Sequence, residues 1–390
     1  MTSGRGWAVS LLAAVVLSCG GGSSGGGPPP VSGPNVIPVT VNGALCSSGS
    51  YVNKPCVSVT VCAPSGSPCQ KIDDILLDTG SYGLRIFRQV LSSVALEQVT
   101  VGSLPLAQCT RYADASSQWG PVEMAAVVLG SEPAVTVPVQ VVDATFGTLP
   151  SGCANAQRSP ADGGYNGVLG VGPFAQDCGS ACVTAADLGV YYTCSGSTCS
   201  GTTVPLSSQV TNPVALVPLD NNGLAVELPS VPAGGAVAVN GSVILGIGTR
   251  TNNVPQGVDV YPVDARGDFV TSLDGASFVA FLDTGSNGLF FGSSSLPQCA
   301  SPDTGWYCPA NTTSFAATNA GAGGSPSSTV DFQIANFDNL INSSNSVFAD
   351  VGGIQAAGFD WGLPFHLGRT VYVGLENGQS SLGSGPFFAY

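Results

Sequence analysis

Charged side chains are scarce in this chain of 390 residues, and basic ones are the scarcest. Charged residues make up 9% of the sequence, and Lys+Arg number 10 against 24 for Asp+Glu, which gives a formal net charge of −14. The lysines are Lys54 and Lys71 alone. Binding along a phosphate backbone needs clustered lysine and arginine, so nucleic acid is not an expected partner. The acidity is interpreted as a means of keeping the surface soluble, with tolerance of acid as the alternative.

Histidine is almost absent, and this argues against most metal sites. His366 is the single histidine, and no C-x-x-C pair occurs. A site of the H-E-x-x-H type needs a second histidine, so no metal and no other cofactor is expected. His366 lies in the apolar stretch "PFHLG", which we interpret as a strand with a packed core histidine.

Glycine and short apolar runs are abundant. The chain has Gly 53 and Pro 28, and hydrophobic residues make up 44%. Runs such as "VSVTVCAP", "VTVPVQVVD" and "GSVILGIG" alternate with Gly, Pro, Ser and Asn, and no heptads or long helical patterns appear. This pattern predicts an all-β, or mainly β, protein.

The N-terminus has the features of a targeting segment. Arg5 precedes an apolar stretch, Trp7–Leu17, that is too short to span a bilayer. "VLSC" at Val16–Cys19 is similar to a bacterial lipobox, so residues 1–18 are predicted to be a signal peptide and Cys19 the lipidation site. Residues 19–34, rich in Gly, Ser and Pro, would be the tether. An ordinary signal peptide cleaved near Ser18 is the alternative.

These features predict an exported protein. Gly20, rather than Asp, follows the acceptor cysteine, which by similarity to Gram-negative lipoproteins indicates the outer membrane. The protein is therefore expected to be lipid-anchored to the bacterial outer membrane or periplasmic, touching the membrane through the lipid alone.

Cysteine usage agrees with export. The chain has 13 cysteines, and setting Cys19 aside leaves an even number, twelve. We interpret them as up to six disulfides that hold surface loops, without fixing the connectivity, and a zinc site is the less favoured alternative. The neighbours in sequence are Cys46/Cys56, Cys62/Cys69, Cys178/Cys182, Cys194/Cys199 and Cys299/Cys308, with Cys109 and Cys153 left as a longer-range pair.

One eleven-residue stretch occurs twice. "LLDTGSYGLRI" starts at Leu76 and "FLDTGSNGLFF" at Phe281, and seven of the eleven positions are identical. Each copy is followed by an apolar strand that ends in glycine, Gly170 in "YNGVLGVG" and Gly362 in "FDWGLPFHLGRTVYVG". Each half is therefore predicted to contain a strand, a turn with an aspartate and a glycine, several hairpins and a closing strand. This repeated order indicates internal duplication.

The paired Asp-Thr-Gly-Ser loops resemble those of the pepsin-like aspartic peptidases. The resemblance runs from about Asn35 to Tyr390 and implies a bilobal pepsin-like double β-barrel with the active-site cleft between the lobes. The N-terminal lobe would be residues 35–230, with the first Asp loop and a flap, and the C-terminal lobe residues 231–390, with the second Asp loop. A single Asp-Thr-Gly would be read as a hairpin turn, but two copies with matching flanks favour a site.

The chemistry that the resemblance implies uses Asp78 and Asp283 as the catalytic pair. Two carboxylates a few ångströms apart cannot both ionise, so the pair holds one proton, as in aspartic proteases generally. The ionised member activates a water and the protonated member donates to the substrate carbonyl. The residues expected to support the pair are Thr79, Gly80, Ser81, Thr284, Gly285 and Ser286.

A flap is expected between the first Asp loop and "GVLGVG". The stretch "RYADASSQWGPVEMAAVVLG" falls there, and Tyr112 is nominated as the flap tyrosine, with Trp119 near the tip or its base. An exposed turn tyrosine with a core tryptophan is the alternative. Many members of the family carry a tryptophan shortly after the first loop, where this chain has Arg85.

The function predicted from the sequence is that of an aspartic endopeptidase acting on an extended peptide or protein substrate. A monomer is expected. The alternatives are a non-catalytic pepsin-like binding protein or inhibitor, and a structural surface lipoprotein on a disulfide-stapled β scaffold.

Overall fold

The computed structural model describes residues 32–47, 49 and 51–390, which belong to one compact unit. The predicted signal peptide, the lipidation site Cys19 and most of the tether lie outside the described residues. No helix among the described residues is long and apolar enough to cross a membrane.

Strands dominate the structure, which confirms the mainly β prediction: 43% of residues are in strands and 10% in helices, with a six-stranded barrel and a half-barrel. The first strands are β1 (Val36–Val41), β2 (Pro55–Cys62), β3 (Cys69–Asp78), β4 (Tyr82–Phe87), β5 (Glu97–Gln98), β6 (Thr100–Val101), β7 (Leu104–Arg111), β8 (Ser117–Val128), β9 (Val135–Val142), β10 (Gly167–Val171), β11 (Tyr191–Ser195), β12 (Thr198–Gly201) and β13 (Gly223–Leu228). The later strands are β14 (Val239–Leu245), β15 (Val260–Pro262), β16 (Phe269–Leu273), β17 (Ala276–Leu282), β18 (Leu289–Phe291), β19 (Thr313–Ala320), β20 (Ser327–Ile334), β21 (Gly352–Ile354), β22 (Phe359–Trp361), β23 (Arg369–Gly374), β24 (Gln379–Ser380), β25 (Gly383–Ser384) and β26 (Phe387–Ala389).

The α-helices are all short, and local signals explain their limits. They are α1 (Pro160–Gly163), α2 (Ser180–Thr184), α3 (Phe337–Ile341) and α4 (Leu363–His366). For α1, the Ser159 side chain accepts from the Asp162 N–H at the start, and Gly164 ends the helix with φ 75°.

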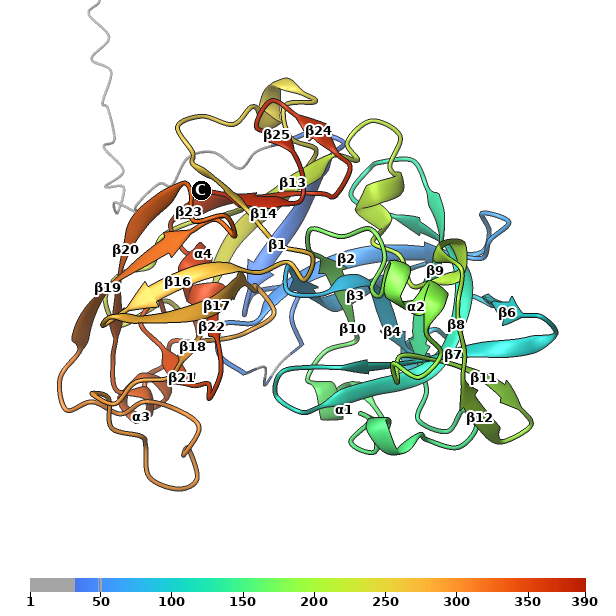
Figure 1. Ribbon diagram of the computed structural model, residues 1–390, viewed down its shortest axis with the longest axis horizontal. Coiled ribbons are helices and arrows are strands. Elements are labelled where there is room, and N and C mark those ends of the chain that lie inside the picture. Colours follow the sequence, from blue (N-terminus) through green and yellow to red (C-terminus); the bar gives the residue numbers. More distant parts are fainter. Residues whose placement is uncertain (1–31, 48, 50) are drawn as a thin grey trace, which may run out of the picture. The chain divides into compact units, whose positions relative to one another are not determined.

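Three adjacent strands support the first Asp loop. Strand β10 lies between β3, which it pairs with in parallel, and β4, which it pairs with antiparallel (Figure 1). Leu169 is opposite Leu77 on one side and Leu84 on the other. All three side chains are buried in the main apolar core. The loop after Asp78 therefore begins at the end of a strand that is covered on both sides.

The second Asp loop has the same arrangement of strands. Strand β22 lies between β17, in parallel, and β18, antiparallel (Figure 1). Trp361 is opposite Leu282 and Leu289, the residues that correspond to Leu77 and Leu84 in the repeated stretch. The repetition in sequence is thus matched by a repetition in strand pairing.

A continuous set of strand pairs crosses the sequence position predicted as the lobe boundary. Strand β14 pairs with both β1 and β13, and β13 also pairs with β23. The boundary after residue 230 falls in the connection between β13 and β14. The N-terminal strand of the described chain therefore shares a sheet with strands from the C-terminal segment.

All twelve cysteines among the described residues form disulfides, which confirms that they pair and supplies the connectivity that the sequence left open. The bonds are Cys46–Cys56, Cys62–Cys69, Cys109–Cys153, Cys178–Cys182, Cys194–Cys199 and Cys299–Cys308. Most close short loops, so they restrain local segments rather than join distant ones.

The segment around His366 differs from the strand expected there. Residues Leu363–His366 form the short helix α4. Pro364 occupies its second position, in the first turn, where proline is compatible with a helix. His366 is fully buried, and burial lowers its pKa to about 3. It therefore sits in the core as a neutral imidazole, which agrees with a packing role.

Candidate active site

The two Asp-Thr-Gly-Ser loops meet, and their threonines hold them together. The hydroxyl of Thr79 donates to the Leu282 carbonyl (2.9 Å) and accepts from the Thr284 N–H (3.0 Å). The hydroxyl of Thr284 makes the reciprocal pair, donating to the Leu77 carbonyl (2.8 Å) and accepting from the Thr79 N–H (3.0 Å). Both threonines are buried. The four bonds join segments more than 200 residues apart in sequence.

Replacing Thr284 by valine should loosen this junction. The change keeps the shape but removes the hydroxyl, so the Leu77 carbonyl and the Thr79 N–H lose their partners in a buried place. Each unpaired buried group costs about 1–3 kcal/mol, so we expect a loss of at least about 2 kcal/mol in the free energy of unfolding, measured in urea. Thr284→Ser keeps the hydroxyl and should lose much less. A larger loss in Thr284→Ser than in Thr284→Val would show that the methyl contact, rather than the hydroxyl, holds the loops.

Glycine is required where the loops approach one another. A Cβ atom at Gly80 would lie 2.6 Å from Cγ of Asp283, and one at Gly285 would lie 2.9 Å from Cγ of Asp78. Contacts this short do not occur in folded proteins, so only glycine permits the approach. Each carboxyl group therefore lies against the backbone of the opposite loop.

Each carboxyl group is also held by its own loop. Oδ1 of Asp78 accepts from the Gly80 N–H (2.8 Å), and its Oδ2 accepts from the Ser81 hydroxyl. Oδ1 of Asp283 accepts from the N–H groups of Gly285 (2.7 Å) and Ser286 (3.2 Å). The Ser286 hydroxyl donates to Asp283 Oδ2 (2.7 Å). These bonds fix the orientation of both groups before any ligand arrives.

The environment of the pair favours a bound proton. The pKa of Asp283 is raised well above its usual value, first by burial and then by the negative charge of Asp78, with a side-chain hydrogen bond to Asp78 adding to the effect. A raised pKa in one of two adjacent carboxyl groups is expected when the two share a proton. The arrangement can therefore supply one acid and one base to a molecule bound above it.

A pocket of about 450 Å³ opens above the carboxyl pair. Asp78 and Asp283 are both part of its wall, and so are Gly285 and Ser286. The rest of the wall is mixed. Its aromatic and apolar members are Tyr51, Leu76, Tyr112, Ala113, Tyr165, Val168 and Phe290, and its polar members are Asp114, Ser116, Gln157, Asp162 and Asn287. Aromatic and apolar surface beside converging polar groups is the usual form of a ligand site.

The nominated flap tyrosine does line this pocket. Tyr112 lies at the turn that joins the antiparallel strands β7 and β8, and its hydroxyl donates to Gln118 Oε1 (2.9 Å). Trp119 lies in β8 and is completely buried, with its Nε1–H donating to the Phe146 carbonyl (2.6 Å). Trp119 is therefore a core residue of the hairpin, opposite Cys109, and takes no part in the pocket wall.

Arg85 occupies the space behind that hairpin. It is 2% exposed, donates to the Thr110 hydroxyl on β7 (2.9 Å) and the Tyr82 carbonyl (2.7 Å), and pairs with Asp177 (3.1 Å). The buried Arg85–Asp177 ion pair thus lies where many pepsin-like peptidases, which the sequence resembles, have a tryptophan.

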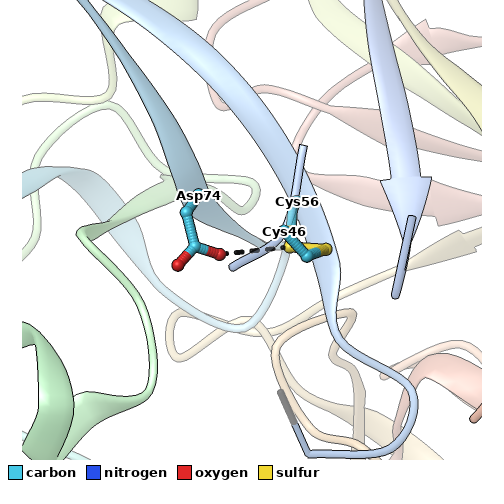
Figure 2. Close-up of side chains that lie close together, drawn as sticks. All are labelled: Cys46, Cys56 and Asp74. Atoms are coloured by element: carbon cyan, nitrogen blue, oxygen red, sulfur yellow. Dashed lines mark hydrogen bonds between the residues drawn. A yellow bond between two sulfur atoms is a disulfide. The ribbon is translucent and has the colours of Figure 1, made fainter. Parts of the chain in front are cut away.

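Two clusters of cysteine and aspartate among the described residues have ligand atoms close enough to suggest a metal, but their chemistry does not fit one. They are Cys46, Cys56 and Asp74, and Cys299, Cys308 and Asp338. In each cluster the two cysteines are joined by a disulfide. Figure 2 shows the first, with the Cys56 sulfur 3.5 Å from Asp74 Oδ1. Metal binding by cysteine needs the thiolate, so these sulfur atoms have a structural role.

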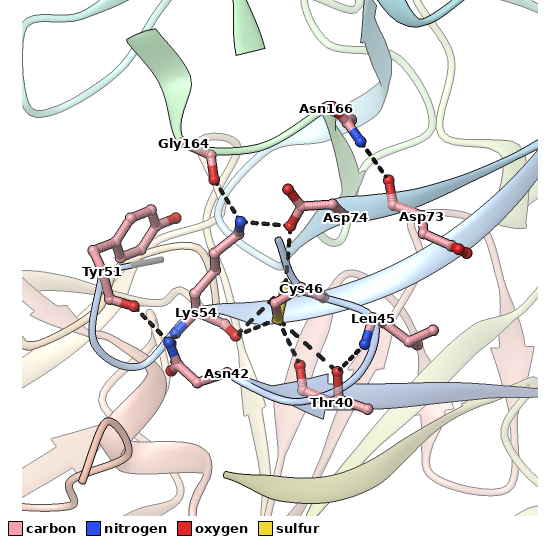
Figure 3. The surroundings of a disulfide bond; sticks show 11 residues. Thr40, Asn42, Leu45, Cys46, Tyr51, Lys54, Asp73, Asp74, Gly164 and Asn166 are labelled. Carbon is pink, nitrogen blue, oxygen red and sulfur yellow. Dashed lines mark hydrogen bonds and ion pairs between the residues drawn. A yellow bond between two sulfur atoms is a disulfide. The ribbon is translucent and has the colours of Figure 1, made fainter. Parts of the chain in front are cut away.

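The Cys46–Cys56 disulfide supports the segment that carries Tyr51 into the pocket wall. Beside it the buried Lys54 ammonium group pairs with Asp74 and donates to the Gly164 carbonyl (Figure 3). Asn42 Nδ2 donates to the Tyr51 carbonyl (2.7 Å). The pKa of Tyr51 is raised, first by burial and then by neighbouring groups that include Asp78 and Asp283. Its hydroxyl is therefore neutral and close to the carboxyl pair.

Sequence reasoning missed several residues near the pair. Tyr51 and Tyr165 gave no motif signal, because they reach the pocket through long-range folding. Asp360 could have been found: it stands in "FDWG", where the first half of the chain has the apolar Val168 in "GVLG". It is buried on β22, and the next residue, Trp361, accepts from the Asp283 N–H through its carbonyl.

Comparison with known proteins gives a family without an assigned activity. A family model described as "Protein of unknown function (DUF3443)" matches residues 32–390. A search of curated proteins finds no match.

Proposed function

The chain belongs to the DUF3443 family, and we propose that it is an aspartic endopeptidase. The observation that carries the proposal is the pairing of Asp78 and Asp283 at the pocket wall, where the reciprocal threonine bonds hold the two loops together. An Asp-Thr-Gly sequence that served only as a hairpin turn would not need a second copy hydrogen-bonded to it. The same pairing supports the finer description of the fold as pepsin-like and bilobal, with the cleft between residues 35–230 and 231–390.

The proposed reaction needs no covalent intermediate. With one proton on the pair, the ionised carboxylate takes a proton from a bound water while that water's oxygen attacks the peptide carbonyl carbon. The protonated carboxyl group gives its proton to the carbonyl oxygen, which forms a tetrahedral diol. The C–N bond then breaks as the protonated carboxyl group gives its proton to the leaving amine and one hydroxyl of the diol gives its proton to the other carboxylate, so the pair again holds one proton.

The pocket wall suits a peptide chain in extended form. Tyr51, Tyr112 and Tyr165 surround the carboxyl pair with aromatic surface, and Tyr112 stands on a hairpin turn that can close over a ligand and exclude water. The substrate in this proposal is an extended peptide or protein bound in strand-like fashion.

Export is part of the proposal. Six disulfides in the described residues suit an oxidising compartment. With lipidation at Cys19, the enzyme would act from the outer membrane or in the periplasm, with no nucleic-acid partner and as a monomer.

The test is digestion of a peptide library by the purified wild-type protein between pH 2 and pH 9, with and without pepstatin. We expect internal cleavage of some peptides, with sensitivity to pepstatin. Absence of cleavage by the folded protein at every pH would reject the peptidase. If the folded protein then binds the peptides intact, the non-catalytic binding protein becomes the better account.

The pH dependence of cleavage follows from the raised pKa of Asp283. An isolated aspartate loses its proton near pH 4, whereas burial and the Asp78 charge keep a proton on this pair to higher pH. Cleavage should therefore persist above pH 4 and fall only as the pH rises through the raised pKa. The profile of kcat/KM against pH measures this directly. An alkaline limb at or below pH 4 would contradict it.

A further inference from the structure

The three tyrosines in the pocket wall differ in what their hydroxyl groups bind. The Tyr112 hydroxyl donates to Gln118 Oε1 (2.9 Å). The Tyr165 hydroxyl donates to Gln157 Oε1 (3.3 Å) and accepts from Gln118 Nε2 (3.4 Å). The Tyr51 hydroxyl has no hydrogen-bond partner among the described residues, and the side chain is only partly buried. Within the described chain, Tyr51 is thus the tyrosine of this wall whose hydroxyl is left for a ligand.

The Tyr51 hydroxyl can be reached from the pocket and carries its proton. Its oxygen is not one of the buried side-chain atoms that lack a partner, so it stays accessible within the described structure. Its pKa is raised, first by burial and then by neighbouring groups that include Asp78 and Asp283. The phenol therefore keeps its proton at neutral pH and can donate one hydrogen bond.

Asn53 anchors the segment that carries Tyr51 to the second half of the chain. The Asn53 side chain is completely buried, and its Nδ2 donates to the carbonyl groups of Asn287 and Phe348 (both 2.9 Å). Its Oδ1 accepts from the Phe348 N–H (2.7 Å). Asn287 directly follows Ser286 and also lines the pocket. The Tyr51 segment is therefore bonded directly to the end of the second Asp loop.

Lys54 anchors the same segment to the first half. Its buried ammonium group pairs with Asp74 and donates to the Gly164 carbonyl (Figure 3). Asp74 lies on β3, the strand that ends at Asp78. The Tyr51 ring packs on Gly164, where a Cβ atom would lie 3.2 Å from Tyr51 Cε1. The phenol is thus held between the two halves, next to the carboxyl pair, before a ligand binds.

The charges of the pocket select the kind of acceptor that this hydroxyl can bind. Among the described residues, no lysine, arginine or histidine lines the pocket, whereas Asp78 and Asp283 do. An anionic acceptor would be repelled by the negative charge of the pair. A main-chain carbonyl oxygen is neutral, and an extended peptide presents such acceptors at regular intervals along its length. The Tyr51 hydroxyl therefore fits a peptide carbonyl.

We propose that Tyr51 is a substrate-binding residue, whose hydroxyl donates to a main-chain carbonyl oxygen next to the scissile bond. The reacting carbonyl takes its proton from the carboxyl pair, so a neighbouring carbonyl is left for Tyr51. A bond to a carbonyl that does not react has the same strength in the bound substrate and in the transition state. It therefore sets the affinity rather than the rate of the chemical step. The inference rests on the peptide site proposed above, but not on cleavage.

The substitution Tyr51→Phe removes the donor and keeps the ring. One lost hydrogen bond corresponds to about a 5-fold loss of affinity, so KM for the best-cleaved library peptide should rise about 5-fold while kcat stays nearly unchanged. The Kd of that peptide, measured by calorimetry in the Asp78→Asn background to prevent cleavage, should rise by the same factor. Tyr372→Phe is the matched control. It removes a hydroxyl from β23, outside the pocket, that also has no hydrogen-bond partner among the described residues.

Two results would overturn the proposed role of Tyr51. Unchanged KM and Kd in Tyr51→Phe would show that the hydroxyl does not touch the peptide. A fall in kcat with an unchanged KM would place the hydroxyl on the reacting carbonyl instead of a neighbouring one.

A change in the peptide tests the same bond from its other end. A thioamide sulfur is a weaker acceptor than a carbonyl oxygen, so thioamides are introduced one at a time on each side of the scissile bond. We expect one position to weaken binding to the protein that has Tyr51 and to have no further effect in Tyr51→Phe, because the two changes remove the same bond. Equal losses in both proteins at every position would contradict the proposed bond.

The outcomes separate this role from the peptidase. If the wild type binds a library peptide without cleaving it, the peptidase is rejected, and the ratio of Kd values for Tyr51→Phe and wild type still decides the role of Tyr51. If the wild type cleaves and Tyr51→Phe has a wild-type KM, the role of Tyr51 is rejected and the peptidase stands. A folded wild type that binds no library peptide would reject both.

Discussion

Replacement of Asp78 or Asp283 by asparagine is expected to lower kcat/KM for peptide cleavage by about 10³-fold or more. Asparagine has nearly the same shape and can still accept from the N–H groups of Gly80 or Gly285. It cannot hold the ionised or protonated carboxyl state on which the proposed reaction depends. The double variant should be scarcely worse than either single one, because the two groups act as a unit.

The loss of activity should occur without loss of folding. The asparagine variants remove a buried carboxyl group without removing the threonine bonds between the loops, so their urea unfolding should stay close to that of the wild type. Asp73→Asn is the matched control: it makes the same chemical change on the same strand, but at an exposed position outside the pocket. Full cleavage by either pair variant, or an equal loss in Asp73→Asn, would reject the assigned roles.

Arg85→Met is expected to cause the largest loss of stability, about 3–5 kcal/mol in the free energy of unfolding. Arg85 and Asp177 are both buried, at 2% and 6% side-chain exposure. Asp177 also accepts from the Tyr191 hydroxyl (2.6 Å) and from Gln108. Methionine fills much of the same space but leaves the Asp177 charge without its cation, and a buried unpaired charge is costly.

A second variant and the pH dependence separate this explanation from simple loss of packing. Arg85→Met with Asp177→Asn removes both charges and should recover part of the stability. Burial already raises the pKa of Asp177 to about 6 despite Arg85. Without Arg85 that pKa rises further, so the penalty should be greatest at neutral pH and shrink in acid as Asp177 takes up a proton. A penalty that is independent of pH, measured by urea unfolding, would point to packing alone.

The repeated motif carries most of what the sequence could predict. Asp78 and Asp283 come together because each follows a buried strand and because a glycine allows each loop to approach the other. The apolar strands and the glycines can both be recognised in the sequence. That the cysteines form disulfides could also be predicted from their even number, whereas which cysteine pairs with which was left open. The mainly β character followed from short apolar runs between turn residues.

The remaining features depend on contacts between distant segments. The partner of Arg85 is Asp177, 92 residues away, and no local pattern links them. Tyr51 reaches the pocket because a disulfide and a buried Lys54 hold its loop there. His366 was expected in a strand, but the chain forms a helical turn after Gly362. Trp119 proved to be fully buried, because the pairing of β7 with β8 carries its side chain into the core.

The central claim, that Asp78 and Asp283 share one proton, is tested most directly by a carboxyl-carbon NMR titration of aspartate-labelled protein. Signals are assigned by comparing the wild type with Asp78→Asn and Asp283→Asn. We expect the pair to lose its protons in two separate steps, the second well above pH 4, and the replacement of either aspartate to abolish the separation. Two signals that titrate independently near pH 4, each unaffected by loss of the other, would contradict it.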